Sequence, residues 1–323
     1  TETDPYLNPG IIPEDDYFVQ DSLGNIDIFR WFSYKPMFNP GGRKVSFIDL
    51  TNPEAVNWWY HDVMKTLLSD IGIDGAKIDF CEWFPEEEEL QFHSGRNPKG
   101  MHHLYPVLFN AWSYRNFQHY RPEGGICWSR GGGIGAQRYP FLWCGDQNRE
   151  FYYLRPVLSA KLSSGLSGIP FMGNDLGGFS PTSNPVERAR QDRIFIRAAQ
   201  MDCFGIAMEC HGQVQAPYEF DEETINIFRK YARIHYALIP YIIEYAVIAT
   251  KTGVPLLRHL YLEFPGDERV WEIEDQYMYG SDILVAPVLD DVTKRDVYLP
   301  EGEWVDLNTG KVYTGRQELQ AYP

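Results

Sequence analysis

The chain has 323 residues, which is enough for one large domain or for a large domain followed by a small one. Hydrophobic residues make up 44% and charged residues 23%, the proportions of a folded globular protein. The formal net charge of −16 argues against nucleic acid and membrane surfaces as partners, because a negative surface repels phosphate groups. The longest apolar runs, such as residues 283–289, are far shorter than the roughly 20 residues that span a bilayer.

Residues 1–45 are rich in Pro, Gly, Asn and Asp without periodicity, which predicts a loop with short pieces of structure. A helix is predicted from Thr51, because Thr51 and Glu54 have capping-box spacing and an apolar stripe follows. Gly72 ends this helix, and residues 73–80 read as a buried strand.

The order of a helix followed by a strand then recurs along the chain. The helical segments are a polar helix-and-loop region over 99–121, then 149–165 and about 185–202. The strands predicted with them cover 125–129, 138–143, 167–173 and 204–209. This alternation predicts an α/β fold with a parallel sheet or barrel.

A long helix is predicted over about 221–252, bent at Pro240. From Tyr277 onwards short strands alternate with turns, which predicts a small antiparallel β domain. We therefore expect an α/β domain over residues 1–265 and a β domain over 266–323.

Functional groups of parallel α/β folds collect at the carboxyl ends of the strands. The polar residues at or just after these ends are Asp79, Arg130, Asp146, Asp175 and His211. Each alone is weak evidence, since a strand-end aspartate is commonly a turn residue or helix cap and a single histidine is commonly structural. Together, two aspartates on separate strands with aromatic neighbours fit a glycosidase that uses a pair of carboxylates. The aromatic neighbours are Phe80, Trp83 and Trp143.

Competing chemistries lack their motifs: the sequence has no GxSxG, phosphate-binding loop, HExxH or tight His/Asp metal cluster. The five cysteines are an odd number without a CxxC pair, which argues against a disulfide framework and a thiolate zinc site. They favour a reducing compartment such as the cytoplasm, and a secreted or periplasmic location stays open. We predict neither a cofactor nor a metal.

At these positions the sequence resembles glycoside hydrolase family 31, the retaining α-glycosidases. The segments that carry the resemblance are 47–59, 73–82, 129–146, 169–179 and 275–310. The resemblance implies that Asp79 is the nucleophile and Asp146 the general acid/base. It also implies that Lys77, Arg130, Trp143, Asp175 and His211 bind the sugar. Lys77 stands where α-glucosidases of the family often carry Trp, and the Lys form is similar to members acting on α-xylosides and some other non-glucose α-glycosides.

The resemblance implies a (β/α)8 TIM barrel followed by a small antiparallel β-sandwich domain. It begins near the third strand of the family's barrel, so we expect the first strands to be missing from this chain. The expected partners are an oligosaccharide or α-glycoside and the missing N-terminal part of the barrel, in the same protein or in a separate chain. The implied activity is retaining exo-α-glycosidase action on a glucoside, xyloside or galactoside. The alternatives are an α-transglycosylase and a non-catalytic carbohydrate-binding fragment.

Overall fold

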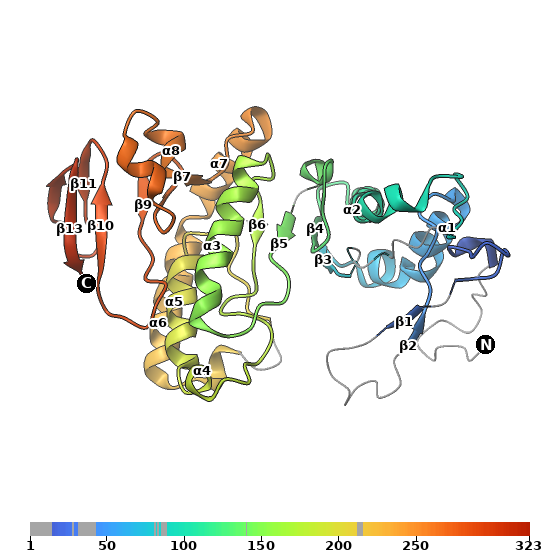
Figure 1. Cartoon of the computed structure of the whole chain (residues 1–323), viewed down its shortest axis with the longest axis horizontal. Coiled ribbons are helices and arrows are strands. Elements are labelled where there is room, and N and C mark those ends of the chain that lie inside the picture. The colour runs from blue at the N-terminus through green and yellow to red at the C-terminus, as the bar shows by residue number, and fades with distance from the viewer. Residues whose placement is uncertain are drawn as a thin grey trace. The chain divides into compact units, whose positions relative to one another are not determined.

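The computed structural model describes residues 15–27, 29–31, 43–80, 82, 84, 89–139, 141–211 and 216–323. The predicted aromatic neighbour Trp83 therefore lies outside the described residues, as does Cys81. The chain divides into two compact units, Thr1–Leu142 and Trp143–Pro323, and each is described by itself (Figure 1).

The first unit contains three parallel strands and one long helix. Its elements are η1 (Asp15–Tyr17), β1 (Phe29–Trp31), β2 (Arg43–Val45), α1 (Pro53–Trp58), η2 (Trp59–Val63), η3 (Thr66–Ile71), β3 (Gly75–Ile78), α2 (Pro98–Tyr120), β4 (Ile126–Ser129), η5 (Ala136–Arg138) and β5 (Phe141–Trp143). The boundary between the units falls within β5. The helix predicted from Thr51 is observed as the successive segments α1, η2 and η3, and the strands predicted in this unit are confirmed with shorter bounds. The predicted burial of the strand over 73–80 is wrong, because Gly75 is exposed and the other residues of β3 are only partly buried.

The predicted capping box of Thr51 and Glu54 is wrong, because Asn52 caps α1 instead. The Glu54 amide donates to Asn52 Oδ1 at 2.9 Å, while Asn52 Nδ2 donates to the Asp16 carbonyl at 3.0 Å. The Thr51 hydroxyl instead donates to the Asp49 carboxylate at 2.7 Å. At the other end Gly72 adopts φ 76°, which confirms it as the helix stop.

Strands β3, β4 and β5 are parallel, and their register sorts the side chains onto two faces. Lys77 lies opposite Trp128, and Trp128 lies opposite Phe141. Because neighbouring residues of a strand point to opposite faces, these three side chains share one face. Cys127 points to the other face, where it joins a core with Phe117 of α2. One face is thus buried against a helix, and the other is left for polar and aromatic groups.

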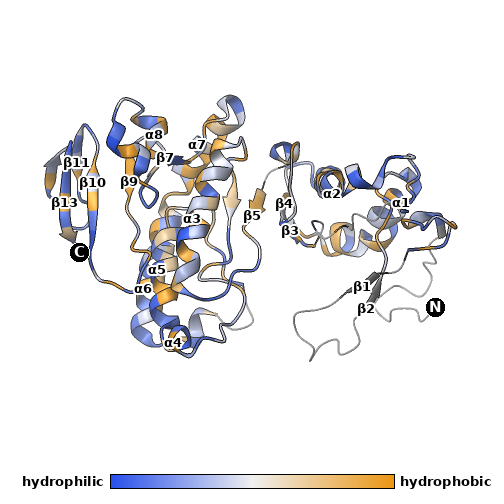
Figure 2. Cartoon of the chain, viewed as in Figure 1, coloured by the Kyte–Doolittle hydropathy of each residue, from blue (hydrophilic) through white to orange (hydrophobic). Residues whose placement is uncertain are grey.

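The second unit contains a helical layer followed by antiparallel strands. Its elements are α3 (Phe151–Leu166), β6 (Met172–Gly173), α4 (Pro185–Arg188), α5 (Gln191–Asp202), η6 (Pro217–Glu219), α6 (Glu222–Ala237), α7 (Ile239–Thr252), β7 (Leu257–His259), α8 (Leu260–Glu263), η7 (Glu268–Glu272), β8 (Tyr277–Tyr279), β9 (Ile283–Val285), β10 (Arg295–Leu299), β11 (Glu303–Val305), β12 (Val312–Thr314) and β13 (Gln317–Tyr322). Figure 2 shows hydrophobic and hydrophilic residues on the same helices of this unit, as expected for amphipathic helices that cover a core.

The predicted long helix is observed as α6 and α7, which separate at Leu238, shortly before Pro240. The predicted strand over 204–209 is wrong, because this segment has no strand partner and is irregular. Its apolar residues Phe204, Ile206 and Met208 pack against the core without forming a ladder. An alternating apolar pattern therefore reflected burial here and not sheet pairing.

The antiparallel part shares a buried core with the helices, through Tyr277 and Tyr279 of β8, and ion pairs add to this contact. Arg155 of α3 pairs with Asp275 at 3.4 Å and with Asp290 at 3.1 Å. Arg193 of α5 pairs with Asp291 at 3.0 Å. Strands β7, β8 and β9 form one antiparallel sheet, and β10 pairs with β13. The domain boundary near residue 265 stays a prediction.

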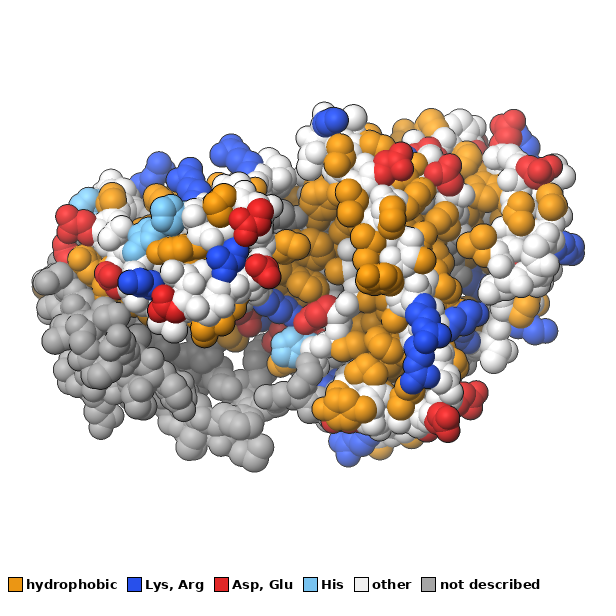
Figure 3. All heavy atoms as spheres, turned by 180° about the vertical axis from the view of Figure 1, so that it is seen from behind, with side chains coloured by type: hydrophobic (Ala, Val, Ile, Leu, Met, Phe, Trp, Pro, Cys, Tyr) orange, Lys and Arg blue, Asp and Glu red, His pale blue; other side chains and the backbone are white. Residues whose placement is uncertain are grey.

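Hydrophobic side chains gather on the face of the second unit seen in Figure 3. The exposed large apolar residues of α7 are Ile239, Ile243 and Val247, which recur at helical spacing. The opposite side of α7 is buried through Ile242, Tyr245 and Ala249, so this helix is apolar on more than one side.

Within the part of the chain that the structure describes, no helix is both long and apolar enough to cross a bilayer.

We predict that Asn52→Ala lowers the free energy of unfolding by about 1–2 kcal/mol, because the amide of Glu54 loses its cap. Asn57→Ala is the matched control, since Asn57 is an exposed residue of the same helix. That change should be neutral or slightly stabilising, because Ala has the higher helix propensity. Urea unfolding of the two variants checks the difference, and equal stabilities would contradict the assigned cap.

Candidate active site

In the first unit, Asp79 and Arg130 follow directly on two neighbouring parallel strands. The amide of Arg130 donates to the Ile78 carbonyl at 3.0 Å, which continues the pairing of β3 with β4 by one residue. Arg130 Nη1 lies 3.0 Å from Asp79 Oδ1, and Arg130 Nε lies 2.5 Å from Glu82 Oε1. The Arg130 side chain is 10% exposed and that of Asp79 is 41% exposed. A largely buried cation therefore holds a carboxylate that is itself open to a ligand.

The backbone at Phe80 is held in an uncommon conformation beside this ion pair. Phe80 has φ 70°, which is strained for a residue other than glycine. Its amide donates to Asp79 Oδ1 at 3.0 Å, and its ring lies 4.4 Å beneath the Arg130 guanidinium. Strain of this kind is retained where the surrounding contacts over-determine it, and it gathers at functional sites.

Lys77 shares a strand face with the position of Asp79, two residues further on. Its ammonium lies 5.3 Å from the centre of the Trp128 ring, and this ring packs edge-on against Phe141 at 4.8 Å. The first unit thus gathers Lys77, Asp79 and Arg130, three of the residues that the sequence predicted. The structure also brings Glu82 next to Arg130. No spacing in the sequence indicates that these two residues are partners.

In the second unit, Asp146 lies in a loop that turns at Gly145, which has φ 78°. Trp143 is 3% exposed, whereas Asp146 is exposed. The backbone before the turn is held by the Cys144 amide, which donates to the Gly173 carbonyl of β6 at 3.0 Å. The buried Trp143 and the turn at Gly145 therefore hold the backbone of Asp146, whose carboxyl group faces solvent.

The loop of Asp175 lies against the loop of Asp146. The amides of Phe179 and Ser180 both donate to the Gln147 carbonyl at 2.9 Å. A side chain at Gly178 would approach the Asn148 carbonyl to 2.8 Å, so only glycine permits this contact. Asp175 itself is 1% exposed, which makes it one of the most buried carboxyl groups described.

The segment that ends at His211 lies against the same group of loops. The His211 ring packs edge-on against Phe179 at 4.5 Å. The segment before it is held by the Leu176 amide, which donates to the Glu209 carbonyl at 2.9 Å. The second unit therefore gathers the loops of Trp143, Asp146, Asp175 and His211. Asp79 belongs to the first unit and Asp146 to the second, and their pairing stays a prediction.

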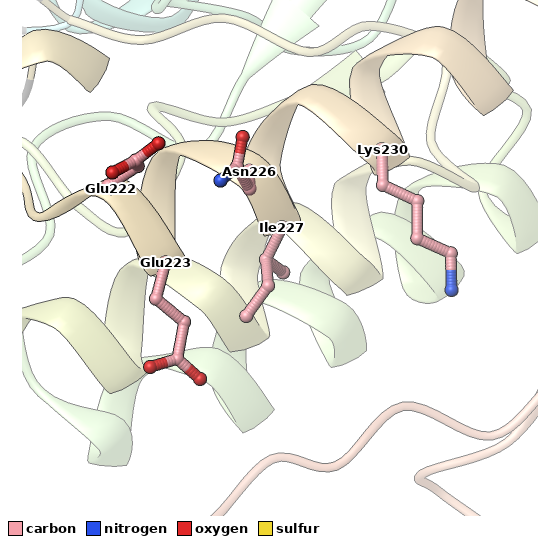
Figure 4. Close-up of a pocket in the computed structure, with 5 residues that line it drawn as sticks. All are labelled: Glu222, Glu223, Asn226, Ile227 and Lys230. Atoms are coloured by element: carbon pink, nitrogen blue, oxygen red, sulfur yellow. The ribbon is translucent and has the colours of Figure 1, made fainter.

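A separate depression runs along α6, and Figure 4 shows that all its labelled residues come from this one helix. They are Glu222, Glu223, Asn226, Ile227 and Lys230. None of them belongs to the loops described above. A smaller cavity lies between those loops, lined by Gln147, Asn174 and Asp175 among others. No cluster of three or more His, Cys, Asp or Glu side chains that could hold a metal occurs within the described ranges.

Comparison with known proteins matches the chain to two family models. Residues 3–245 match the glycosyl hydrolases family 31 TIM-barrel domain, and residues 253–323 match the glycosyl hydrolase family 31 C-terminal domain. The prediction of a TIM-barrel domain followed by a C-terminal β domain is confirmed.

The α-xylosidase XylQ of Lactiplantibacillus pentosus is 33% identical to this chain over 324 residues. The aligned region covers 95% of this chain and 40% of XylQ. An isomaltosyltransferase of Sporosarcina globispora is 31% identical over 84% of this chain and 25% of its own length. The solved structure of a family 31 sulfoquinovosidase from E. rectale, bound to an aza-sugar inhibitor, has a TM-score of 0.84 and 30% identity. It covers 95% of this chain and 45% of its own. The chain thus spans less than half the length of these relatives.

We predict that Arg130→Gln and Glu82→Gln are coupled. Removing the cation leaves Asp79 and Glu82 as neighbouring carboxylates, so neutralising Glu82 should then cost less than it does in the wild type. Urea unfolding of the single and double variants should give a coupling free energy of about 0.5–3 kcal/mol. Arg115→Gln, at an exposed position of α2, serves as the control and should combine additively with Glu82→Gln. Additive effects of Arg130→Gln would contradict the shared cation.

We predict that Cys144 is protected from alkylation in the folded protein. Burial raises the pKa of its thiol to about 11, so at pH 8 the reactive thiolate is scarce. Iodoacetamide labelling followed by mass spectrometry should show slow modification of Cys144 that accelerates in urea. Fast native labelling at pH 8 would show that the thiol beside the Asp146 loop is open to solvent.

Proposed function

We propose a function for this chain from one premise: it belongs to glycoside hydrolase family 31. We infer that the protein is a retaining exo-α-glycosidase that removes terminal α-linked sugars by double displacement. Asp79 is the nucleophile and Asp146 the general acid/base. Because the chain spans less than half the length of these relatives, the activity is a proposal for the whole protein.

The ion pair of Asp79 with Arg130 carries this proposal. A nucleophilic carboxylate must be ionised and must face the substrate, and both requirements fit its observed surroundings. Arg130 is 10% exposed and contacts Asp79 at 3.0 Å, while 41% of the Asp79 side chain is accessible. The strained backbone of Phe80 supports the same assignment, since it keeps the Phe80 ring against the guanidinium.

The proposed reaction has two steps. In the first, an Asp79 oxygen forms a bond to the anomeric carbon while the bond to the leaving oxygen breaks, and that oxygen takes the proton of Asp146. In the second, water gives its proton to Asp146 and attacks the anomeric carbon, and the bond to Asp79 breaks. The products are the free sugar with its original α configuration and the aglycone. Both carboxyl groups return to their starting protonation states.

Sugar binding is assigned to residues around each carboxyl group. Lys77 can donate to a ring hydroxyl from the strand face that it shares with Asp79. Trp143, which is 3% exposed, is the aromatic residue next to the Asp146 loop. Asp175 lines the small cavity between the loops, where its carboxyl group can accept a hydrogen bond from a sugar hydroxyl, and His211 can donate or accept one. We propose glucosides, xylosides and galactosides as candidate substrates. Xylosides are included because an α-xylosidase is among the relatives.

Transglycosylation is the second candidate, and one relative named isomaltosyltransferase favours it. It differs from hydrolysis in its second step, where a sugar hydroxyl replaces water. Chromatography of the products formed with and without an added acceptor sugar separates the two reactions. Longer oligosaccharides formed in excess over free sugar would assign the transferase activity.

We predict that the full-length protein releases nitrophenol from one member of a panel of nitrophenyl α-glycosides. The panel holds xylose, glucose, galactose, N-acetylgalactosamine and sulfoquinovose. Asp79→Ala should lower kcat by about 10⁴-fold or more, because the proposed covalent intermediate forms on this carboxylate. Azide should restore part of this turnover by attacking in place of the carboxylate. Asp74→Ala is the matched control at the opposite end of β3, where the side chain is 91% exposed.

Asp146→Ala tests the acid role separately. This variant should lose activity on poor leaving groups and keep more on an α-glycosyl fluoride, whose departure needs little protonation. Full activity of Asp79→Ala would overturn the assignment of the nucleophile. Sugar binding by a folded wild type that turns over no member of the panel would instead favour a carbohydrate-binding role.

A further inference from the structure

The second unit contains an ion pair that is almost wholly buried. Lys161 Nζ of α3 lies 2.7 Å from Asp202 Oδ1 at the end of α5, and the side chains are 2% and 1% exposed. Taking two charges out of water costs free energy that their attraction does not reliably return. A pair of this kind is therefore a poor source of stability compared with two apolar residues of the same shape. We therefore look for its role in what the pair contacts and not in its own contribution to stability.

The second oxygen of Asp202 leads towards the proposed sugar-binding loop. Asn174 Nδ2 donates to Asp202 Oδ2 at 2.9 Å and also to the Asp175 carbonyl at 3.1 Å. Asn174 is 4% exposed, so these hydrogen bonds are made in a medium where each is strong. One amide group thus connects a buried charge to the backbone of Asp175.

The turn after Asn174 has further anchors. The Gly178 amide donates to the same Asp175 carbonyl at 2.9 Å, and Leu176 donates to the Glu209 carbonyl at 2.9 Å. Glu209 lies two residues before His211, in the irregular segment where a strand was predicted. With no sheet ladder there, this hydrogen bond replaces strand pairing as the restraint that links the two loops.

We propose that Lys161, Asp202 and Asn174 act as positioning residues that orient Asp175 and, through Leu176 and Glu209, the segment that carries His211. Lys161 holds the Asp202 carboxyl group in place through their 2.7 Å contact, Asp202 fixes the amide of Asn174, and Asn174 fixes the backbone of Asp175. None of the three is assigned a contact with the sugar. The inference rests on the proposed function, because the role of Asp175 in binding belongs to that proposal.

Three variants of the full-length protein test the positioning role. Asn174→Leu removes both donated hydrogen bonds and keeps the number and branching of the side-chain heavy atoms. Lys161→Met with Asp202→Asn removes both charges together, which avoids leaving one buried charge unpaired. Arg193→Gln is the control, because it breaks the ion pair of α5 with Asp291 without touching Asn174. Thermal unfolding identifies the variants that stay folded.

Hydrogen exchange followed by mass spectrometry is the first readout, and it does not depend on activity. Peptides covering residues 172–180 and 206–211 contain the Leu176 and Gly178 amides and the segment before His211. We expect exchange over 172–180 to be about tenfold faster in Asn174→Leu and in the double variant, and unchanged in the control. Unchanged exchange in a folded Asn174→Leu protein would overturn the inference.

Kinetics on the best glycoside of the panel is the second readout. Misplacing Asp175 should lower kcat/KM by about 10- to 100-fold, mainly through a higher KM, with the control at wild-type values. Faster exchange together with unchanged kinetics would overturn the link to sugar binding. Loss of the proposed function appears differently, as a wild type without turnover or a fully active Asp79→Ala protein. Hydrogen exchange still decides the positioning of the loop in that case.

Discussion

The parallel register of β3 and β4 decides which side chains of the first unit act together. Ile78 lies opposite Ser129, so the next residues along the two strands, Asp79 and Arg130, emerge side by side and meet at 3.0 Å. A shift by one residue would turn one of these side chains to the helix-covered face, because strand side chains alternate. The ion pair, the stacked ring of Phe80 and the exposure of the carboxylate all follow from this pairing.

In the second unit, the loops that carry the candidate site residues are held in place partly by hydrogen bonds outside any sheet. Its loops are not aligned by a strand ladder beyond β6, since residues 204–209 are irregular. For the segment before His211, the hydrogen bond from Leu176 to Glu209 takes over that role. A buried charge pair lies beneath these loops. This pair is connected to the loop of Asp175 through the Asn174 amide, which donates to both Asp202 and the Asp175 carbonyl.

Predictions that rest on local chemistry agree with the structure, and those that depend on distant partners do not always do so. Gly72 ends its helix because only a residue without a side chain readily adopts its backbone conformation. The cap at Asn52 was missed because Thr51 also has capping chemistry, and its hydroxyl is taken by Asp49. The strand over 204–209 was wrong because apolar alternation records burial, which a core supplies without a sheet.

The amino-acid sequence alone determined the alternation of helices and strands, the family resemblance and the positions of the candidate carboxylates, because these follow from periodicity and short motifs. Only the tertiary structure decided that Arg130 contacts both Asp79 and Glu82, and that Asn174 connects Asp202 to the Asp175 backbone. Lys161 and Asp202 are 41 residues apart, and nothing in their local sequence marks them as partners. Contacts of this kind arise when helices pack, so they are properties of the folded chain and not of any segment of it.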